Sequence, residues 1–126
     1  MKMLSLCARY FLAMAALLAL WSSSLAWAAD SAASDQAKQT WQLLDYLAVD
    51  YGGAVHDGKV QSASEYEEMK EFAATAAQQL GALPSTPALP DLQQRAKALN
   101  ELIAAKADAK SVADSAHSLA AALVKA

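Results

Sequence analysis

Side chains that commonly bind metal ions are concentrated in one short stretch of the chain, between residues 45 and 68. Carboxylate and imidazole donors are typical of sites for iron, manganese or calcium, whereas copper(I) needs soft sulfur ligands. Two phenols, those of Tyr46 and Tyr51, could add further oxygen donors. The pattern indicates a cation site whose candidate ligands are Asp45, Asp50, His56, Asp57, Glu65 and Glu68.

Helical spacing suggests how these side chains could converge. Tyr46 and Asp50 are four residues apart, and Glu65 and Glu68 are three apart, so each pair shares one face of a helix. If the two helices are antiparallel, the end of the first lies beside the start of the second, with Asp57 in the loop between them. We therefore expect three segments to converge on one ion.

Each candidate ligand also has a purely structural explanation. Aspartate before glycine, as at Asp57, is typical of turns, and Glu65 stands where a capping box would place it. A single loop histidine such as His56 is often exposed, and tyrosines at helical spacing often lie at the edge of a core. The surface that carries these tyrosines could therefore be a docking site for a membrane or periplasmic partner, with no bound ion.

No recognised catalytic arrangement accompanies these residues. The only cysteine, Cys7, lies near the N-terminus, and the sequence has no H-E-x-x-H, nucleophile elbow or phosphate-binding loop. His56 and His117 are far apart in sequence and have no evident orienting partner. A C-x-x-C-H haem attachment sequence is also missing. We therefore expect a binding or interaction protein without haem, and not an enzyme.

The N-terminus has the organisation of a secretory signal peptide. Lys2 and Arg9 bracket a basic region, residues 10–21 are an uncharged apolar run, and Ala26-Trp27-Ala28 has the pattern of a cleavage site. The run is shorter than the roughly 20 residues of a membrane span. Cleavage after residue 28 would leave a secreted protein with 8 basic and 13 acidic residues, a net charge of −5. This charge disfavours nucleic acid and anionic membrane surfaces as partners.

Four amphipathic helices are predicted to position the candidate ligands. After a flexible segment at residues 29–34, with Ser34 or Asp35 as N-cap, the first helix has an apolar stripe at spacings of three and four. Trp41 lies in this stripe, and its truncation to alanine is expected to cost about 3–5 kcal/mol. Gly52-Gly53 is expected to end the helix. The stripe consists of Ala37, Trp41, Leu44, Leu47, Ala48 and Tyr51.

A turn signal, Asp57-Gly58, lies in the link at residues 53–61. A tight β-hairpin is one interpretation, but its flanks are short, and we expect an ordered loop with Val55 and Val60 turned inward. Ser62 begins the second helix in a capping box with Glu65. Gly81 ends that helix, whose apolar face consists of Tyr66, Met69, Ala73, Ala76 and Leu80, with Phe72 beside them.

The three prolines lie in residues 82–90, a predicted crossover between helical hairpins at residues 35–81 and 91–125. Asp91 is the expected N-cap of the third helix, and Ser111, together with Asp114, that of the fourth. Short links and one crossover predict an all-α antiparallel four-helix bundle over residues 35–126. The expected inner faces are Leu92, Ala96, Leu99, Leu102 and Ile103, then Val112, Ala116, Leu119 and Leu123.

The central stretch resembles the N-terminal extracytoplasmic domain of bacterial high-affinity iron permeases, and the segment from Leu99 to Leu123 is similar to the end of that domain. The membrane permease part, with its R-E-x-x-E iron motif, and the haem-binding module of some relatives are not found in this sequence. The resemblance implies a periplasmic accessory domain of iron uptake that binds iron, or a similar hard divalent or trivalent cation, or delivers it to a membrane permease. It rests on Leu44-Asp45-Tyr46, Asp50-Tyr51, Gly53-Ala54-Val55, Asp57-Gly58, Val60, Glu65-Tyr66, Glu68 and Phe72.

Overall fold

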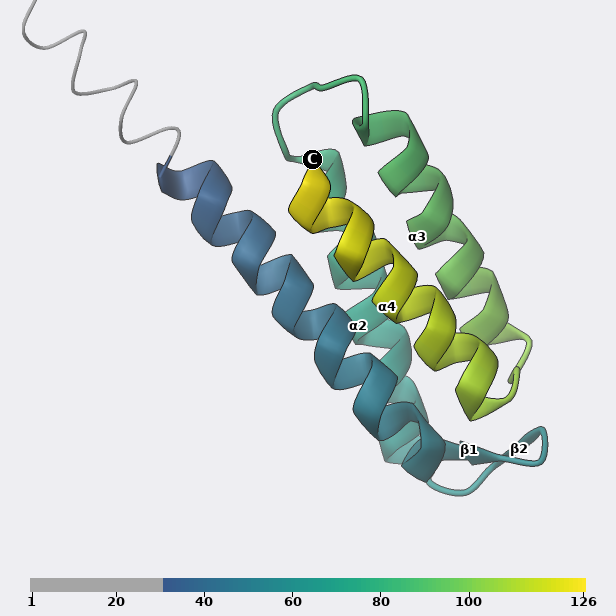
Figure 1. The fold of residues 1–126 in the computed structure, drawn as a ribbon. Helices are drawn as coiled ribbons and strands as arrows, with labels where there is room; N and C mark the ends of the chain where they lie inside the picture. Colours follow the sequence, from purple (N-terminus) through teal and green to yellow (C-terminus); the bar gives the residue numbers. More distant parts are fainter. Residues whose placement is uncertain (1–30) are drawn as a thin grey trace, which may run out of the picture. The chain divides into compact units, whose positions relative to one another are not determined.

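The computed structural model describes residues 31–126, and the predicted signal peptide lies outside the described residues. Residues Asp35–Ala126 form one compact unit. The first helix (residues 31–54) is followed by β1 (Val55–His56), β2 (Lys59–Val60), α2 (Ala63–Gly81), α3 (Leu89–Ala104) and α4 (Ala109–Lys125). Consecutive helices run antiparallel (Figure 1), so the predicted all-α four-helix bundle is confirmed. Within residues 31–126, no helix combines the length and the apolar character that crossing a membrane requires.

Three of the four helices bury the faces that their apolar periodicity predicts. The buried side chains of α2 are the five expected ones, and α4 adds only Ala120 to its predicted set. In α3 the expected face is buried except for Leu102, which is partly exposed. Spacings of three and four residues are sufficient here because each of these helices has a single apolar stripe turned toward the core.

The first helix buries Leu44, Leu47 and Tyr51 of the predicted stripe, but not Trp41. Trp41 is 39% exposed, whereas the preceding Thr40 is fully buried. Burial of this polar side chain is tolerated because its hydroxyl lies 2.9 Å from the carbonyl oxygen of Gln36 and 2.7 Å from Oε1 of Gln79. The prediction that Trp41 is a main core residue is therefore wrong. The residues of this helix that are buried are Thr40, Leu44, Leu47, Tyr51 and Ala54.

Gly52 and Gly53 do not end the first helix, which continues to residue 54. The two glycines differ in how closely another element approaches them. A Cβ atom on Gly52 would lie 3.5 Å from Cβ of Ala109, and one on Gly53 would lie 3.3 Å from Oε2 of Glu65. A side chain on Gly52 would therefore make only ordinary contact with α4, whereas one on Gly53 would crowd the Glu65 carboxylate of α2.

The link after the first helix is a minimal β-hairpin, and the prediction of a strandless loop is wrong. Val55 pairs with Val60, and His56 pairs with Lys59. Asp57 and Gly58 both have positive φ angles, 52° and 71°, as a two-residue type I′ turn requires. The Asp-Gly turn chemistry outweighs the shortness of the flanks. Val55 is buried and Val60 is partly buried, so the inward direction of the valines is supported.

The helix starts agree with prediction only in α2, where Oγ of Ser62 accepts a hydrogen bond from the Glu65 amide at 3.3 Å. Asp91 does not cap α3, which begins at Leu89. Pro90 lies in the first turn of that helix, where its missing N–H costs nothing. Asp108 caps α4 by accepting from the Ser111 amide, so Ser111 lies inside the helix. Residues 31–34 are helical, and neither residue 34 nor residue 35 is a cap.

Two tyrosines of the first hairpin hold the turn between α3 and α4. The Tyr51 hydroxyl donates to the carbonyl oxygen of Ala107 at 2.7 Å, and the Tyr66 hydroxyl donates to that of Ile103 at 2.8 Å. Lys106 has a φ angle of +54° in this turn. The amides of Lys106 and Ala107 return to the carbonyls of Ile103 and Leu102, which is a Schellman ending of α3. The tyrosine hydroxyls therefore join the two helical hairpins at this end of the bundle.

Candidate functional site

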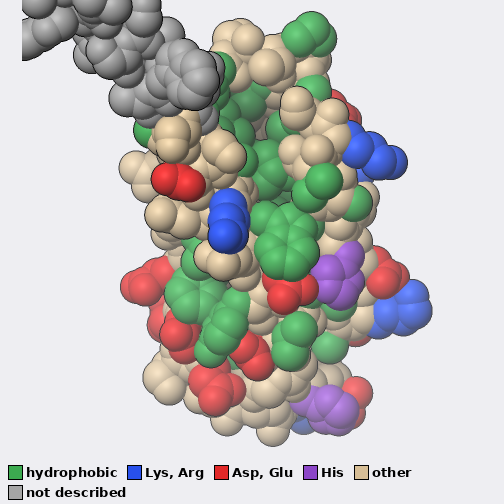
Figure 2. All heavy atoms as spheres, turned by 60° about the vertical axis from the view of Figure 1, so that its left-hand side comes forward, with side chains coloured by type: hydrophobic (Ala, Val, Ile, Leu, Met, Phe, Trp, Pro, Cys, Tyr) green, Lys and Arg blue, Asp and Glu red, His purple; other side chains and the backbone are tan. Residues whose placement is uncertain are grey.

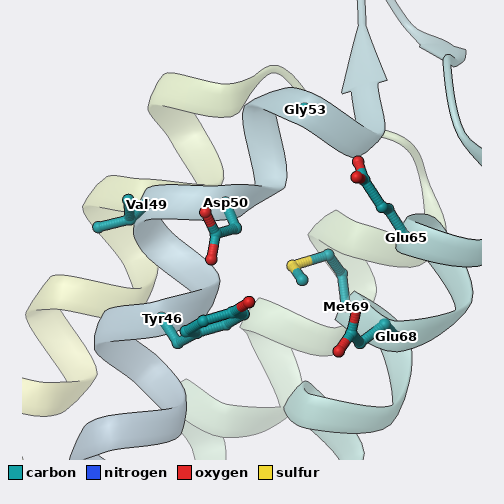
Figure 3. A pocket seen from close by; sticks show the side chains of 7 residues that line it. All are labelled: Tyr46, Val49, Asp50, Gly53, Glu65, Glu68 and Met69. Carbon is teal, nitrogen blue, oxygen red and sulfur yellow. The ribbon is translucent and has the colours of Figure 1, made fainter.

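A cleft of about 230 Å³ lies between the first helix and the start of α2. Each wall is one face of a helix, because its residues follow one another at spacings of three or four. This surface hollow is called the acidic cleft below. Its lining residues, drawn in Figure 3, are Tyr46, Val49, Asp50 and Gly53 from the first helix, with Glu65, Glu68 and Met69 from α2.

Oxygen atoms face the acidic cleft from both helices. Figure 3 shows the Asp50 carboxylate and the Tyr46 hydroxyl on the side of the first helix, with Glu68 opposite and Glu65 reaching toward the end of the first helix. Met69 lies between these walls and is almost fully buried. The cleft therefore offers hard donors on two sides of an open space.

The electrostatics of the acidic cleft are negative. The Asp50 carboxylate, through its charge and a hydrogen bond to the phenol, raises the pKa of Tyr46, and the charges of Glu68 and Glu65 raise it further. Among residues 31–126, no lysine or arginine lies within ion-pair distance of any of these three carboxylates. The three carboxylates therefore line one cleft without a lysine or arginine partner, and a bound cation would be favoured there.

Asp45 lies outside the acidic cleft, on a different face of the first helix. One of its carboxylate oxygens is 3.9 Å from Nε2 of His117 on α4, and both side chains are about half exposed. This partner of His117 was not predicted, since the two residues are distant in the chain. Antiparallel packing of the first helix and α4 brings them together.

His56 and Asp57 also lie away from the acidic cleft, at the tip of the hairpin. Nε2 of His56 is 3.4 Å from a carboxylate oxygen of Asp57, and both side chains are largely exposed. Figure 1 shows the hairpin extending sideways from the end of the bundle. The expected convergence of three segments is therefore not found, because paired strands carry the Asp57 turn away from the space between the helices.

The six candidate ligands thus fall into three places, and only Asp50, Glu65 and Glu68 share a cleft. Within the described part of the chain, no three histidine, cysteine, aspartate or glutamate side chains stand close enough together to hold a metal ion in this conformation. Val49, Gly53 and Met69 line the cleft but were not predicted as site residues. The sequence signal that could have predicted them is their spacing of three or four residues from Tyr46, Asp50 and Glu65, which places them on the same helix faces.

Comparison with known proteins identifies one family. The family model for the iron permease-associated 4-helix bundle domain matches residues 27–126. No curated protein and no solved structure matches the chain. The family match covers all of the residues that form the bundle and the acidic cleft.

Proposed function

Because the chain belongs to the iron permease-associated 4-helix bundle family, we propose that it binds iron, or a similar hard cation, in the acidic cleft and delivers it to a membrane permease. Family membership fits an accessory role in iron uptake and suggests a membrane transport partner. The proposed location is the periplasm, after removal of residues 1–28. The proposed role is binding and transfer, without a catalytic step and without haem.

The observation that supports this proposal is that the carboxylates of Asp50, Glu65 and Glu68 line one cleft, with no lysine or arginine paired to them among the described residues. Carboxylate and phenol oxygens are hard donors that suit ferrous or ferric iron. Glu65 and Glu68 have exposed side chains with several rotatable bonds. Rotation of these side chains can bring their oxygens toward Asp50 at the cost of side-chain entropy, about 1.5–2 kcal/mol for each glutamate.

The openness of the acidic cleft suits transfer of an ion better than storage. Its walls are two helices at the surface, so an ion held there keeps water ligands and can exchange with an incoming partner. A closed site with a full set of protein ligands would release its ion slowly. The proposed iron is therefore cargo, and the bundle is expected to fold without it.

Calorimetric titration of the metal-free protein with ferrous ions, under anaerobic conditions, tests the proposal. Asp50→Asn, Glu65→Gln and Glu68→Gln are each expected to weaken binding by about tenfold, equivalent to about 1.4 kcal/mol. The matched control is Glu101→Gln, which removes the same charge from an exposed carboxylate on α3. This control is expected to bind like the wild type.

Acidification is a second arm of the same titration. Protons compete with the cation for the carboxylate oxygens, so ferrous affinity is expected to fall as pH is lowered. Absence of ferrous, ferric and manganous binding by the wild type at micromolar concentration would refute the proposal. Equal affinity in the wild type and all three cleft variants would place the ion elsewhere.

A further inference from the structure

A second hollow continues from the acidic cleft along the same two helices. Its volume is about 460 Å³, and Tyr46 lines both this hollow and the acidic cleft. Its centre is hydrophobic, formed by Leu43, Tyr46 and Phe72, with the two rings in edge-to-face contact at a centroid distance of 5.3 Å. Its far end carries neutral polar side chains, including Gln42 and Gln79. We call this second hollow the Tyr46–Phe72 groove.

Large hydrophobic side chains are exposed where the groove and the cleft meet. Tyr46 is 51% exposed and Val49 is 71% exposed. The two residues are one turn apart on the same face of the first helix, so they form one exposed hydrophobic surface. Figure 2 shows acidic side chains gathered around a hydrophobic patch on the lower part of this face. A joined hydrophobic and acidic surface of this kind is characteristic of an interaction site.

The charge distribution of the bundle indicates the sign of the partner. Residues 35–81 contain eight acidic and three basic side chains, whereas residues 82–126 contain four and five. All four acidic residues of the second hairpin have partners within that hairpin. Asp91, Glu101 and Asp114 form ion pairs, and Asp108 caps α4. Negative charge is thus left without local compensation at the cleft end of the groove. A partner that fits this surface is basic.

The size of the surface indicates the form of the partner. From Gln79 to Glu65, α2 rises by about 21 Å, at 1.5 Å per residue, which is the length of about four helical turns. Side chains of the first helix and of α2 border a hollow with a hydrophobic centre, which is the arrangement used in helix-in-groove recognition. The three zones, amide, hydrophobic and acidic, occur in that order along the groove.

We propose that the Tyr46–Phe72 groove is a docking site for a basic amphipathic helix of a partner protein. Hydrophobic side chains of that helix pack on Tyr46 and Phe72, and lysine or arginine side chains at one of its ends meet Glu65 and Glu68. An anionic lipid surface fits poorly, since the same carboxylates repel it. This inference goes beyond iron binding and does not depend on it.

The test uses a synthetic helical peptide of about four turns, with leucines along one face and lysines at one end. Titration into the isotope-labelled protein, followed by nuclear magnetic resonance, is expected to shift the signals of Tyr46, Phe72 and Thr75 together with Glu68. A peptide with glutamates in place of the lysines is expected not to bind. Equal binding of the two peptides would overturn the proposal.

Two exposed glutamines provide a matched pair of variants. Gln42→Lys places a charged side chain next to Leu43 and Tyr46, where the leucine face of the peptide packs, and is expected to weaken peptide binding by roughly tenfold. Gln94→Lys makes the same change at an exposed position of α3 and is expected to bind the peptide like the wild type. Neither change affects the core. A similar loss in both variants would show that net charge alone governs binding, and would overturn the docking site.

Ferrous titration of Gln42→Lys separates this inference from the proposed function. Gln42 does not line the acidic cleft, so this variant is expected to lose peptide binding while it retains ferrous affinity. No ferrous binding by the wild type, with intact docking of the basic peptide, would refute only the iron proposal. Two further measurements test other occupants of the groove. Sedimentation with phosphatidylglycerol vesicles tests an anionic lipid surface, and sedimentation of the protein alone tests a second copy of the chain. Vesicle binding without peptide binding, or self-association blocked by Gln42→Lys, would overturn the proposal.

Discussion

Tyr46 reports the charge of the acidic cleft at the level of one residue. Its pKa is raised above the ordinary value of 10.0, first by the Asp50 charge, then by their hydrogen bond and by the charge of Glu68. Since the folded protein holds this proton more tightly than the unfolded chain, stability is expected to fall as pH rises from about 10 through the raised pKa. A cation in the cleft would act in the opposite direction and lower this pKa.

Asp50→Asn is predicted to bring the pKa of Tyr46 down toward its ordinary value, because the largest cause of the shift is removed. The ring signals of Tyr46 in a pH titration by nuclear magnetic resonance provide the measurement. Asp114→Asn on α4, which removes an equal charge from an exposed ion pair, is the control. An unchanged Tyr46 pKa in Asp50→Asn would mean that the two side chains do not interact in solution.

Lys106 is a second residue whose conformation leads to a specific prediction, here for the free energy of unfolding. It occupies the left-handed position that ends α3, with a φ angle of +54°, where a side chain costs roughly 1–2 kcal/mol relative to glycine. Lys106→Gly is therefore predicted to raise the free energy of unfolding by about 1 kcal/mol in urea denaturation. Lys97→Gly, in the interior of α3, is predicted to lower it by about 1 kcal/mol. Equal destabilisation by both changes would contradict the assigned helix ending.

At the scale of the element, substitutions at Gly52 and Gly53 of the first helix distinguish effects on stability from effects on ion binding. Gly52→Ala and Gly53→Ala both lie in helical backbone, so each is predicted to stabilise the protein by roughly 0.5–1 kcal/mol. A Cβ atom on Gly53 approaches Oε2 of Glu65 to 3.3 Å, whereas one on Gly52 meets Ala109 at an ordinary distance. Gly53→Ala should displace Glu65 and weaken ferrous binding, and Gly52→Ala should not.

Thermal or urea unfolding and ferrous calorimetry of these two variants provide the measurements. Loss of stability in Gly52→Ala would mean that the end of the first helix is packed more tightly than the structure shows. Unchanged ferrous affinity in Gly53→Ala would mean that the position of the Glu65 carboxylate beside Gly53 does not contribute to ion binding. The two variants therefore test the helix packing and the ligand assignment independently.

Periodicity was a good guide to the elements and a poor guide to their ends. The buried faces of α2 and α4 follow directly from spacings of three and four, because only one face of each helix is hydrophobic. In the first helix two adjacent stripes compete, and hydrogen bonds to Gln36 and Gln79 allow Thr40 to occupy the core instead of Trp41. Sequence spacing alone contains no information on such bonds between helices.

The candidate site was predictable only where it depended on helix pairing. Antiparallel packing of neighbouring helices brings Asp50 opposite Glu65 and Glu68, as spacing indicated. The direction of the hairpin was not predictable in the same way, since it depends on the positive φ angles of Asp57 and Gly58. The pairing of Asp45 with His117 depends on the packing of the first helix against the fourth.

At the scale of the whole molecule, the two helical hairpins have different roles. The second hairpin pairs its own charges, and its turn accepts hydrogen bonds from Tyr51 and Tyr66. Each of these tyrosines directly follows a carboxylate of the acidic cleft, Asp50 or Glu65. The buried side of the first hairpin thus fixes the bundle, while its exposed side carries the acidic cleft and the Tyr46–Phe72 groove.

The central claim is that a cation binds between Asp50, Glu65 and Glu68, and paramagnetic broadening by manganous ions tests its location most directly. Substoichiometric manganous ion, added to the isotope-labelled protein, broadens the amide signals nearest to the bound ion. The strongest broadening is predicted at Gly53, Glu65 and Glu68 and in the turn of the first helix around Asp50. Broadening centred on His56 and Asp57, or on Asp45 and His117, or none at all, would contradict it.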